Sequence, residues 1–189
     1  MASEIIHHYK IQSSLELGES KNYILASCEE IFFESSVRKK FETEADRKSF
    51  LYSYFGYYLE NFPELFYVAY QQLNDQPPKV LGYICGCPDT LNEPALLIMH
   101  SYLNDFKEDY PSYPAHLHIN CHRDSRGMGV GSALIKTLEN SLKSQNIPGL
   151  HLITSEDAQN VSFYEKNGYN HRTLKDNGGF KILLLGKTL

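Results

Sequence analysis

The glycine-rich stretch Arg126-Gly-Met-Gly-Val-Gly-Ser132 is the segment whose residue types and spacing point most directly to chemistry. It follows an alternating, strand-like run at 115–122 and precedes a run with helical spacing at 129–145. Backbone N–H groups at the start of a helix lack partners within the helix, and the helix dipole adds positive charge there, so this turn favours an anion such as pyrophosphate. The residues expected to bind a phosphorylated cofactor are Arg126, Gly127, Met128, Gly129, Val130, Gly131 and Ser132.

The spacing of these glycines narrows the choice of cofactor. A mononucleotide P-loop needs two glycines separated by four residues and followed by Lys and Ser or Thr, which the chain lacks. A dinucleotide fingerprint needs Gly-x-Gly-x-x-Gly, but Ser132 stands at the position of the third glycine. We therefore rank coenzyme A above NAD, and a nicotinamide oxidoreductase is a third interpretation.

A second chemical pattern lies in the run 115–122. Because successive side chains of a strand point to opposite faces, one face carries Ala115, Leu117, Ile119 and Cys121, and the other carries His116, His118, Asn120 and His122. We expect the polar face to border a cleft, where a histidine, which titrates near neutrality, is suited to accept a proton. Hydrogen-bonded structural histidines and a His-x-His zinc pair are the alternatives.

Hydrophobic periodicity and the positions of Gly and Pro predict the strands and helices that must position these residues. We expect strands at 7–12, 64–71, 80–87, 115–122, 149–155, 169–175 and 180–185, and helices at 19–33, 44–61, 95–106, 129–145 and 158–167. The strands at 64–71 and 80–87 form a predicted hairpin around Pro77-Pro78. The helix at 95–106 belongs to an inserted segment at about 90–114.

Composition limits the class of protein. With 189 residues, 42% hydrophobic and 22% charged, the chain predicts a single folded domain over 1–189. The net charge is −5 and the 18 Lys and Arg form no basic stripe, so no nucleic-acid partner is expected. No apolar run reaches the roughly 20 residues of a membrane span, and Met1 to Lys10 lack a secretory signal, so we expect a cytoplasmic protein without a membrane partner.

The four cysteines are expected to be reduced and mostly buried. Cys85 and Cys87 alternate on a predicted strand, and such a pair can supply two ligands to a soft metal, but two more ligands would be needed. We interpret them as small core residues and expect no metal site.

Two motifs in order resemble a known family. Arg126-x-x-Gly129-x-Gly131, after a strand and opening a helix, resembles the acyl-CoA pyrophosphate loop of the GNAT acetyltransferase superfamily. Asn160-Val-Ser-Phe-Tyr164-Glu-Lys-Asn-Gly168-Tyr169 resembles the second signature of that superfamily. The similar region runs from about Ala115 to Tyr169. Pro114-Ala-His-Leu-His-Ile119 and the insertion before it also resemble, more weakly, the acetyltransferase-like domain associated with some O-GlcNAc hydrolases.

The resemblance implies an α+β fold with a central, mostly antiparallel mixed sheet flanked by helices, in which the fourth and fifth strands splay apart. The pantetheine arm of acetyl-CoA would pair with the backbone of Ile119 and Cys121 in the gap, and Asn160 would reach the same arm. Tyr164 would act as the acid that protonates the departing thiolate, and His118, then His116, are the candidates for the base.

The activity that the resemblance implies is N-acetyl transfer from acetyl-CoA to an amine by direct attack in a ternary complex. The alternative is a non-catalytic acyl-CoA-binding or interaction module. The acceptor is left open between a small amine, an amino sugar, a peptide N-terminus and a lysine, with the acidic balance favouring a cationic amine. Aromatic residues of 50–59 and of the insertion, namely Tyr102, Phe106, Tyr110 and Tyr113, are expected to wall its pocket. A homodimer is compatible with the sequence.

Overall fold

The computed structural model describes residues 9–72, 74 and 76–189. Its centre is a seven-stranded sheet in the order β1-β2-β3-β4-β5-β7-β6. The strands are β1 (Lys10–Ser13), β2 (Phe66–Gln71), β3 (Lys79–Cys87), β4 (Ala115–Cys121), β5 (Gly149–Ser155), β6 (His171–Asn177) and β7 (Phe180–Thr188). All neighbouring strands are antiparallel except β4 and β5, which are parallel. The expected mixed sheet and the β2–β3 hairpin are confirmed.

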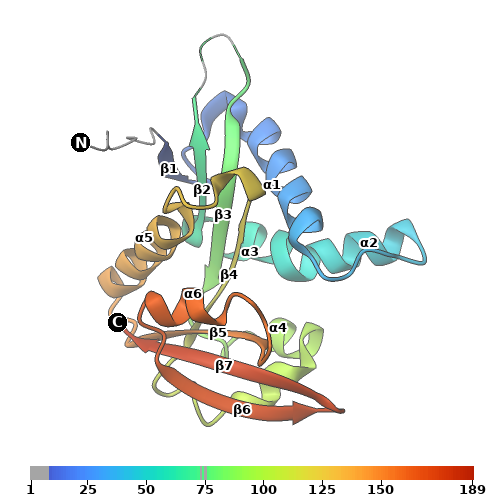
Figure 1. Cartoon of the computed structure of the whole chain (residues 1–189), viewed down its shortest axis with the longest axis vertical. Coiled ribbons are helices and arrows are strands. Elements are labelled where there is room, and N and C mark those ends of the chain that lie inside the picture. Colours follow the sequence, from blue (N-terminus) through green and yellow to red (C-terminus); the bar gives the residue numbers. More distant parts are fainter. Residues whose placement is uncertain (1–8, 73, 75) are drawn as a thin grey trace.

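The parallel strands β4 and β5 stay together for two residue pairs. Ala115 pairs with Leu150 and His116 with His151, and the pairing ends there. In Figure 1, β5, β7 and β6 run across the direction of β2 and β3, so the sheet is sharply turned at this junction. The predicted splay is therefore present, and it leaves the side of β4 that faces β5 without a strand partner from Leu117 onward.

Helices cover both faces of the sheet. They are α1 (Lys21–Ser35), α2 (Glu44–Leu51), α3 (Tyr57–Asn61), α4 (Pro94–Met99), α5 (Val130–Ser144) and α6 (Val161–Lys166). On one face α1 and α3 bury Ile24, Phe32 and Tyr58 against β2 and β3. On the other face α5 buries Leu134 and Leu138 against strands on both sides of the splay. Figure 1 shows α1 and α5 on opposite sides of β3 and β4.

The helix expected at 44–61 is interrupted. The chain forms α2, then a π-helical turn η2 (Tyr52–Gly56), then α3. A π-helical turn holds one residue more than an α-helical turn and often occurs at functional sites. The ring of Tyr54, within η2, lies 4.4 Å from His100 and 5.2 Å from His118 between centroids. Periodicity does not reveal such a turn, because a single added residue leaves the apolar stripe nearly intact.

The inserted segment also differs in detail from one continuous helix at 95–106. It forms α4 and a 3-10 helix η4 (Ser101–Phe106), and the break falls at His100, whose backbone is not helical at φ −125° and ψ 74°. The ring of His100 meets the carbonyl of Ser53 at 2.9 Å, so a tertiary contact with η2 holds the break.

The remaining elements agree with the expected ones within a few residues. For the first predicted strand, at 7–12, residues 7 and 8 lie outside the described residues, and β1 begins at Lys10. None of the helices in the described part of the chain is long and apolar enough to cross a bilayer.

Gly149 at the start of β5 allows a test of the close packing between β5 and the residues before β4. A Cβ there would lie 2.1 Å from the carbonyl oxygen of Ser112 and 2.9 Å from the Tyr113 ring. Gly149→Ala should lower the free energy of unfolding by about 2–3 kcal/mol, because the backbone of Ser112 must move. In Gly178→Ala the added Cβ meets nothing within 4 Å, so this control should cost about 1 kcal/mol from the left-handed backbone alone. Urea unfolding measures both, and equal losses would contradict the clash.

Candidate active site

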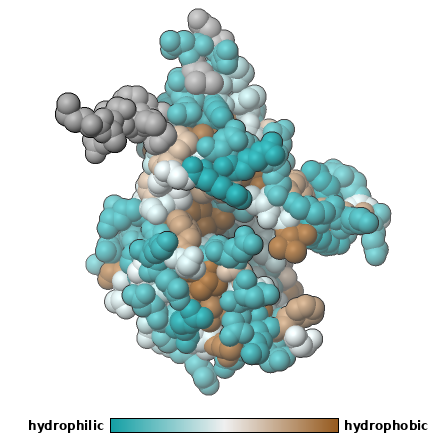
Figure 2. All heavy atoms as spheres, viewed as in Figure 1, coloured by the Kyte–Doolittle hydropathy of each residue, from teal (hydrophilic) through white to brown (hydrophobic). Residues whose placement is uncertain are grey.

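A cleft of about 1010 Å³ opens where β4 and β5 separate. Its walls come from the end of β4, the glycine loop, the start of α5, the loop after β5 and the start of α6. The lining residues are Ser35, Val37, Ile119, Cys121, Ser125–Gly127, Gly129–Ser132, Ser155, Asp157–Asn160, Phe163 and Tyr164. Figure 2 shows hydrophobic residues exposed in the centre of this face between hydrophilic upper and lower parts. A cleft of this size accommodates a cofactor.

The glycine loop presents backbone N–H groups to the cleft. Gly127 and Gly129 have φ values of +78° and +74°, which disfavour any other residue, and a Cβ at either position would meet nothing within 4 Å. Within the described residues, the backbone amides of Gly127, Gly129 and Gly131 donate to no backbone carbonyl. The loop therefore keeps the free donors that a pyrophosphate needs.

One residue of the predicted loop set, Met128, is placed differently, and another, Gly131, lines the cleft but also has a packing role. The amide of Met128 donates to the carbonyl of Ser125 at 3.2 Å, and its side chain packs against the core. Met128 does not line the cleft, whereas Ser125, which was not predicted, does. Gly131 is needed for packing, because a Cβ there would lie 2.9 Å from the Phe163 ring. A glycine pattern alone does not distinguish a packing contact from a phosphate contact.

The backbone of β4 faces the gap at the two predicted residues. The amide of His122 donates to the carbonyl of Leu81 on the β3 side at 2.8 Å. In an antiparallel pair the residues that bond to the partner alternate, so the backbone groups of Ile119 and Cys121 point away from β3 and toward β5. Because β5 has diverged, these groups are available to the amides of an extended ligand.

Asn160 and Tyr164 lie on the opposite wall. Asn160 is the N-cap residue of α6 and Tyr164 is one turn further on, so both line the cleft. Burial, and secondarily Cys121, raises the pKa of the Tyr164 hydroxyl well above its usual value. Tyr164 therefore keeps its proton at neutral pH, as a general acid requires.

A second pocket of about 490 Å³ adjoins the cleft and shares Ser35, Val37, Ile119, Asn160 and Tyr164 with it. It continues between β4, β5 and the α1–η2 region, which contributes the aromatic side chains Phe32, Phe50 and Tyr54. The other lining residues are Ser36, Arg38, Leu117, His118, Asn120 and Leu152–Thr154. Among the described residues of this wall there is no Asp or Glu, and Arg38 is the charged side chain at the rim.

His118 lies in this second pocket. Its ring is 5.2 Å from the rings of both Tyr54 and Tyr58. In the described part of the chain neither ring nitrogen of His118 has a hydrogen-bond partner. Burial lowers the pKa of His118 to about 3, with smaller effects from His100 and His151. The imidazole is thus neutral at physiological pH and has a lone pair available.

His116 is placed differently from His118, and the expectation that the whole polar face borders an open cleft is wrong at this position. His116 is 3% exposed. Its Nε2 meets the hydroxyl of Tyr58, and its Nδ1 lies 3.0 Å from the Thr90 hydroxyl. The Thr90 hydroxyl donates to the Pro114 carbonyl at 2.8 Å, so Nδ1 of His116 donates to Thr90 and Nε2 accepts from Tyr58. Helices packed on the strand bury this end of the polar face.

The aromatic residues expected around the acceptor divide into two groups. Phe50 and Tyr54 line the second pocket. Phe106 and Tyr110 instead are buried against Leu184 of β7, where they support the sheet. Tyr113 stacks on His171, 4.7 Å between centroids. Spacing cannot separate a pocket aromatic from a core aromatic, because both kinds of site bury the ring.

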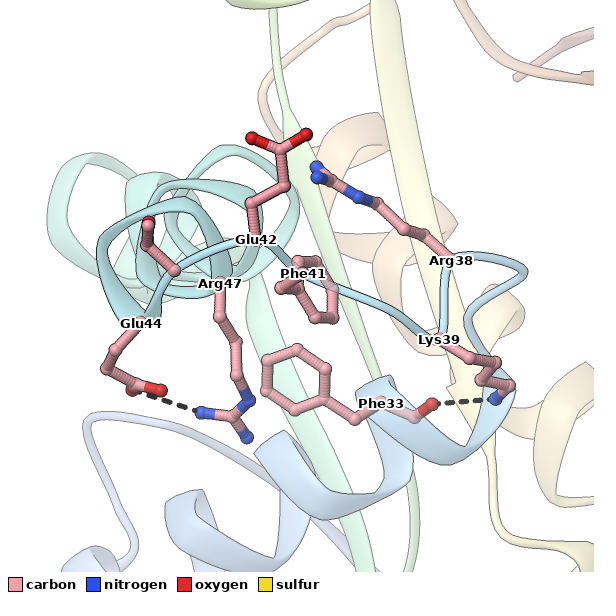
Figure 3. Close-up of a pocket in the computed structure, with 8 residues that line it drawn as sticks. Phe33, Arg38, Lys39, Phe41, Glu42, Glu44 and Arg47 are labelled. Carbon is pink, nitrogen blue, oxygen red and sulfur yellow. Dashed lines mark hydrogen bonds and ion pairs between the residues drawn. The ribbon is translucent and has the colours of Figure 1, made fainter.

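Charged side chains surround a hollow that shares Arg38 with the second pocket (Figure 3). The hollow, of about 430 Å³, is lined by residues of the α1–α2 connection, including Phe33, Arg38, Phe41 and Arg47. Arg47 lies over the Phe33 ring at 3.8 Å, and Arg38 lies over Phe41 at 4.6 Å. Arg38 also pairs with Asp46. These contacts order the α1–α2 connection, which contributes Ser36, Val37 and Arg38 to the second pocket.

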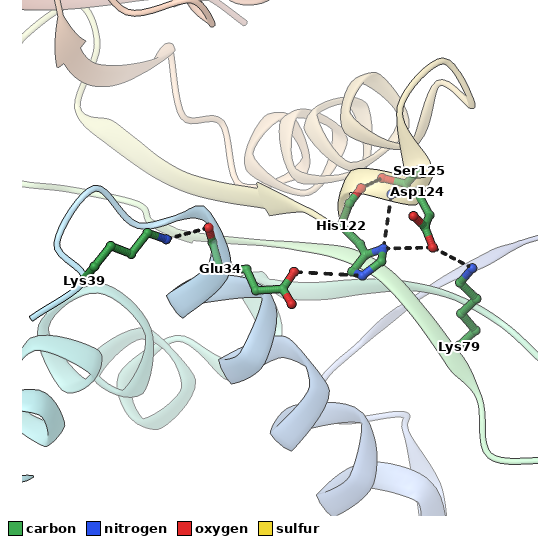
Figure 4. A network of polar contacts seen from close by, with 6 residues as sticks. All are labelled: Glu34, Lys39, Lys79, His122, Asp124 and Ser125. Carbon is green, nitrogen blue, oxygen red and sulfur yellow. Dashed lines mark hydrogen bonds and ion pairs between the residues drawn. The ribbon is translucent and has the colours of Figure 1, made fainter.

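A polar network joins α1 to the segment before the glycine loop (Figure 4). Asp124 lies 3.2 Å from Lys79 Nζ, and its amide donates to Nδ1 of His122 at 3.2 Å. Nε2 of His122 faces Glu34 of α1 at 4.0 Å. The pKa of Asp124 is lowered mainly by the Lys79 hydrogen bond. The network fixes the strand end that leads into the loop.

The cysteines and the described histidines give no indication of a metal centre. All four cysteines are free thiols, and Cys85 and Cys87 are buried in the core. Across residues 9–72, 74 and 76–189, no group of three or more His, Cys, Asp or Glu side chains has metal-binding geometry.

Comparison with known proteins defines the class. The opened sheet with a glycine loop at its gap is the acyl-CoA N-acyltransferase fold. The model of the acetyltransferase (GNAT) family matches residues 25–169, and the chain belongs to this family. It is therefore an acyltransferase, and acetyl-CoA is its cosubstrate.

Solved structures with this fold resemble the whole chain. The crystal structure of SsHAT is 20% identical with a TM-score of 0.69, covering 95% of this chain and 98% of that one. Ard1 from Thermoplasma volcanium is 17% identical with a TM-score of 0.58, covering 96% and 97%. The ribosomal-protein-S18-alanine N-acetyltransferase from Escherichia coli is 16% identical with a TM-score of 0.54, covering 96% and 94%. A sequence search of curated proteins finds no match.

The buried histidines predict how stability depends on pH. Burial lowers the pKa of His151 to about 4 and that of His116 well below its usual value. The unfolded chain therefore takes up these protons first, near pH 6.5, and stability is lost as the pH falls from there toward 4. At pH 5 the free energy of unfolding should be lower than at pH 7 by about 2 kcal/mol for each fully buried histidine.

Urea unfolding between pH 7 and pH 5 measures this dependence. His151→Phe removes one titrating group, so its stability should fall less steeply with acidification than that of the wild-type protein. A slope unchanged by His151→Phe would mean that this ring is not kept neutral by burial.

Proposed function

We propose that this protein transfers an acetyl group from acetyl-CoA to a primary amine by direct attack in a ternary complex. The observation that carries the proposal is the adjacency of two cavities, the cleft and the second pocket, which share Ser35, Val37, Ile119, Asn160 and Tyr164. A cofactor in the cleft and an acceptor in the pocket would meet at these shared residues. This arrangement suits simultaneous binding of both substrates.

In this proposal the glycine loop and Arg126 bind the pyrophosphate, and Ile119 and Cys121 pair with the pantetheine arm. A buried amide of the ligand left unpaired would cost about 1–3 kcal/mol, so these backbone groups also fix its register. Acetyl-CoA supplies an acetyl thioester. Asn160, which the Thr154 hydroxyl contacts at 3.4 Å, is oriented toward the same arm.

Two side chains transfer protons in the proposed reaction, one as the base and one as the acid. His118 takes a proton from the acceptor ammonium, because its ring nitrogens are uncommitted and it lines the acceptor pocket. Tyr164 gives its proton to the departing sulfur, and a backbone N–H of β4 at the gap stabilises the negative charge on the carbonyl oxygen. His116 keeps a supporting role, since both of its ring nitrogens are already bonded.

The pocket lining also bears on the acceptor. An acidic net charge favours a cationic amine, but the described lining of the pocket has aromatic rings and Arg38 and no carboxylate. Without a carboxylate a second positive charge on the acceptor would be unpaired there. We therefore propose an amine that carries a single positive charge on an apolar or aromatic body, and a peptide N-terminus fits this description better than a polyamine.

Tyr164→Phe tests the acid. The variant should bind acetyl-CoA nearly as well as the wild-type protein and lower kcat by roughly 100-fold, because the thiolate leaves without a proton donor. Thiol release is the readout for turnover, and calorimetry is the readout for binding. Unchanged turnover would exclude Tyr164 as the acid.

Ligand binding separates the proposed enzyme from its alternatives. Coenzyme A should raise the melting temperature and NAD should not, because the loop lacks the dinucleotide fingerprint. Thiol release is then followed with phenethylamine, glucosamine, a peptide with a free apolar N-terminus and a lysine blocked at its α-amine. Binding of acetyl-CoA with no release for any of the four would favour a non-catalytic acyl-CoA-binding module.

A further inference from the structure

Behind the acceptor pocket, where β4 and β5 begin to separate, lies a small cavity of about 10 Å³. Its polar lining consists of His100, Tyr102, His116, His118 and His151, and its apolar lining of Leu103, Leu117, Leu152 and Ile153. It shares His118, Leu117, Leu152 and Ile153 with the acceptor pocket. A volume of about 10 Å³ is close to what one water molecule needs, provided that polar partners are present.

His151 provides the first partner. The residue is fully buried, and its Nε2 has no hydrogen-bond partner. Its Nδ1 lies 2.6 Å from the carbonyl oxygen of Tyr113, which only accepts, so Nδ1 carries the hydrogen and Nε2 has a bare lone pair. The Tyr110 ring stacks on the imidazole at 4.8 Å and restricts its rotation. A buried acceptor left unpaired costs about 1–3 kcal/mol, which favours a bound donor at this atom.

His100 provides a second partner by the same reasoning. Its Nε2 lies 2.9 Å from the carbonyl oxygen of Ser53 and therefore carries the hydrogen, which leaves Nδ1 as an acceptor. His116 contributes no lone pair, because Tyr58 and Thr90 engage both of its nitrogens. Two residues that line the cavity thus each carry a free acceptor nitrogen, and a water molecule has two hydrogens to donate.

His118 joins this cavity to the acceptor pocket. It lines both spaces, and neither of its ring nitrogens bonds to a protein group among the described residues. One nitrogen of a neutral imidazole is a donor and the other an acceptor. A water in the cavity would need a donor to complete its bonds, and His118 is placed to supply it.

We propose that the cavity holds one water molecule, which donates to Nε2 of His151 and Nδ1 of His100 and accepts the N–H of His118. The water fixes His118 in the tautomer whose other nitrogen has a lone pair for the acceptor pocket. His151 and His100 are then positioning residues that act on His118 through the water. The catalytic part of this inference rests on the proposed function, whereas the water site itself does not.

Among the described residues that line its two cavities, His118 has no acidic side chain that could orient its ring, so a water molecule is needed for this role. The titratable and charged groups that face it are His100, His116, His151, Tyr54, Tyr58, Tyr102, Tyr164, Cys85 and Arg38. No described residue lining either cavity is a carboxylate. A catalytic base usually has a third group that orients it. Here the water orients His118. Because it accepts a hydrogen bond from the ring, it also stabilises the protonated form of His118.

A crystal structure at high resolution and ¹⁵N NMR of histidine side chains test the water site directly. The expected results are one ordered water within hydrogen-bond distance of Nε2 of His151, and a neutral His151 with its hydrogen on Nδ1. An empty cavity, or a His151 with its hydrogen on Nε2, would overturn the proposal. Both measurements use the unliganded protein and are independent of acetyl transfer.

Kinetics of two His151 variants test the positioning role. His151→Asn keeps a donor near the Tyr113 carbonyl but loses the Nε2 acceptor, whereas His151→Phe keeps the ring volume and loses both nitrogens. With the fastest amine of the four-member panel, both should lower kcat about 10-fold at pH 7 and leave the KM for acetyl-CoA unchanged. Near pH 10 the free amine loses its proton without help, so the defect should shrink to about 3-fold or less.

The pH dependence of the defect distinguishes positioning from a structural role. A loss of equal size at pH 7 and pH 10, or no loss at either, would exclude a positioning role for His151. Thermal denaturation of the two variants shows whether they fold. If the wild-type protein acetylates none of the four amines, the proposed function fails, and diffraction and NMR still decide whether the water site exists.

Discussion

The end of the β4–β5 ladder at His116 and His151 is the constraint on which the rest of the site depends. Backbone N–H and C=O groups in a protein interior need partners, and a sheet normally supplies them strand by strand. Here β5 turns away after two pairs, so one side of β4 is left for a ligand. The cleft, the acceptor pocket and the small histidine cavity all lie where this separation begins.

Burial of imidazoles is the second organising effect. His116, His118 and His151 lie on or beside the two diverging strands, and desolvation lowers the pKa of each. The fold thereby keeps neutral imidazole rings beside the second pocket and the small cavity behind it. The same desolvation makes such a base weak unless a hydrogen-bond partner stabilises its protonated form. The chemistry of the site thus depends on what each ring nitrogen contacts.

The N-terminal helices have a role that goes beyond covering the sheet. The π-helical turn η2 brings Tyr54 against His100 and His118, and the carbonyl of Ser53 fixes the His100 ring. Arg47 over Phe33 and Arg38 over Phe41 order the α1–α2 connection, and Arg38 also lines the second pocket (Figure 3). The N-terminal helices therefore contribute to the wall of the second pocket, while the loop between β4 and α5 lines the cleft.

The sequence by itself determined the features that depend on local chemistry. The strand-loop-helix order around 126–131 and the alternation of 115–121 follow from spacing, because an anion site at a helix start is built from consecutive residues. The assignment of Asn160 and Tyr164 to the site came from the resemblance of their motif to the family's second signature. The resemblance that rests on these residues extended the prediction to the splayed sheet. Most element boundaries followed from periodicity and from Gly and Pro.

Only the tertiary structure decided which chemically similar residues do different things. His116 and His118 share one face of one strand, yet Tyr58 and Thr90 occupy the first while the second lines a pocket. Met128 and Gly131 belong to one loop, yet one packs into the core and the other makes room for Phe163. These differences arise from contacts between segments that are far apart in the chain. Such contacts bury some groups and leave others free to react, and residue spacing does not encode them.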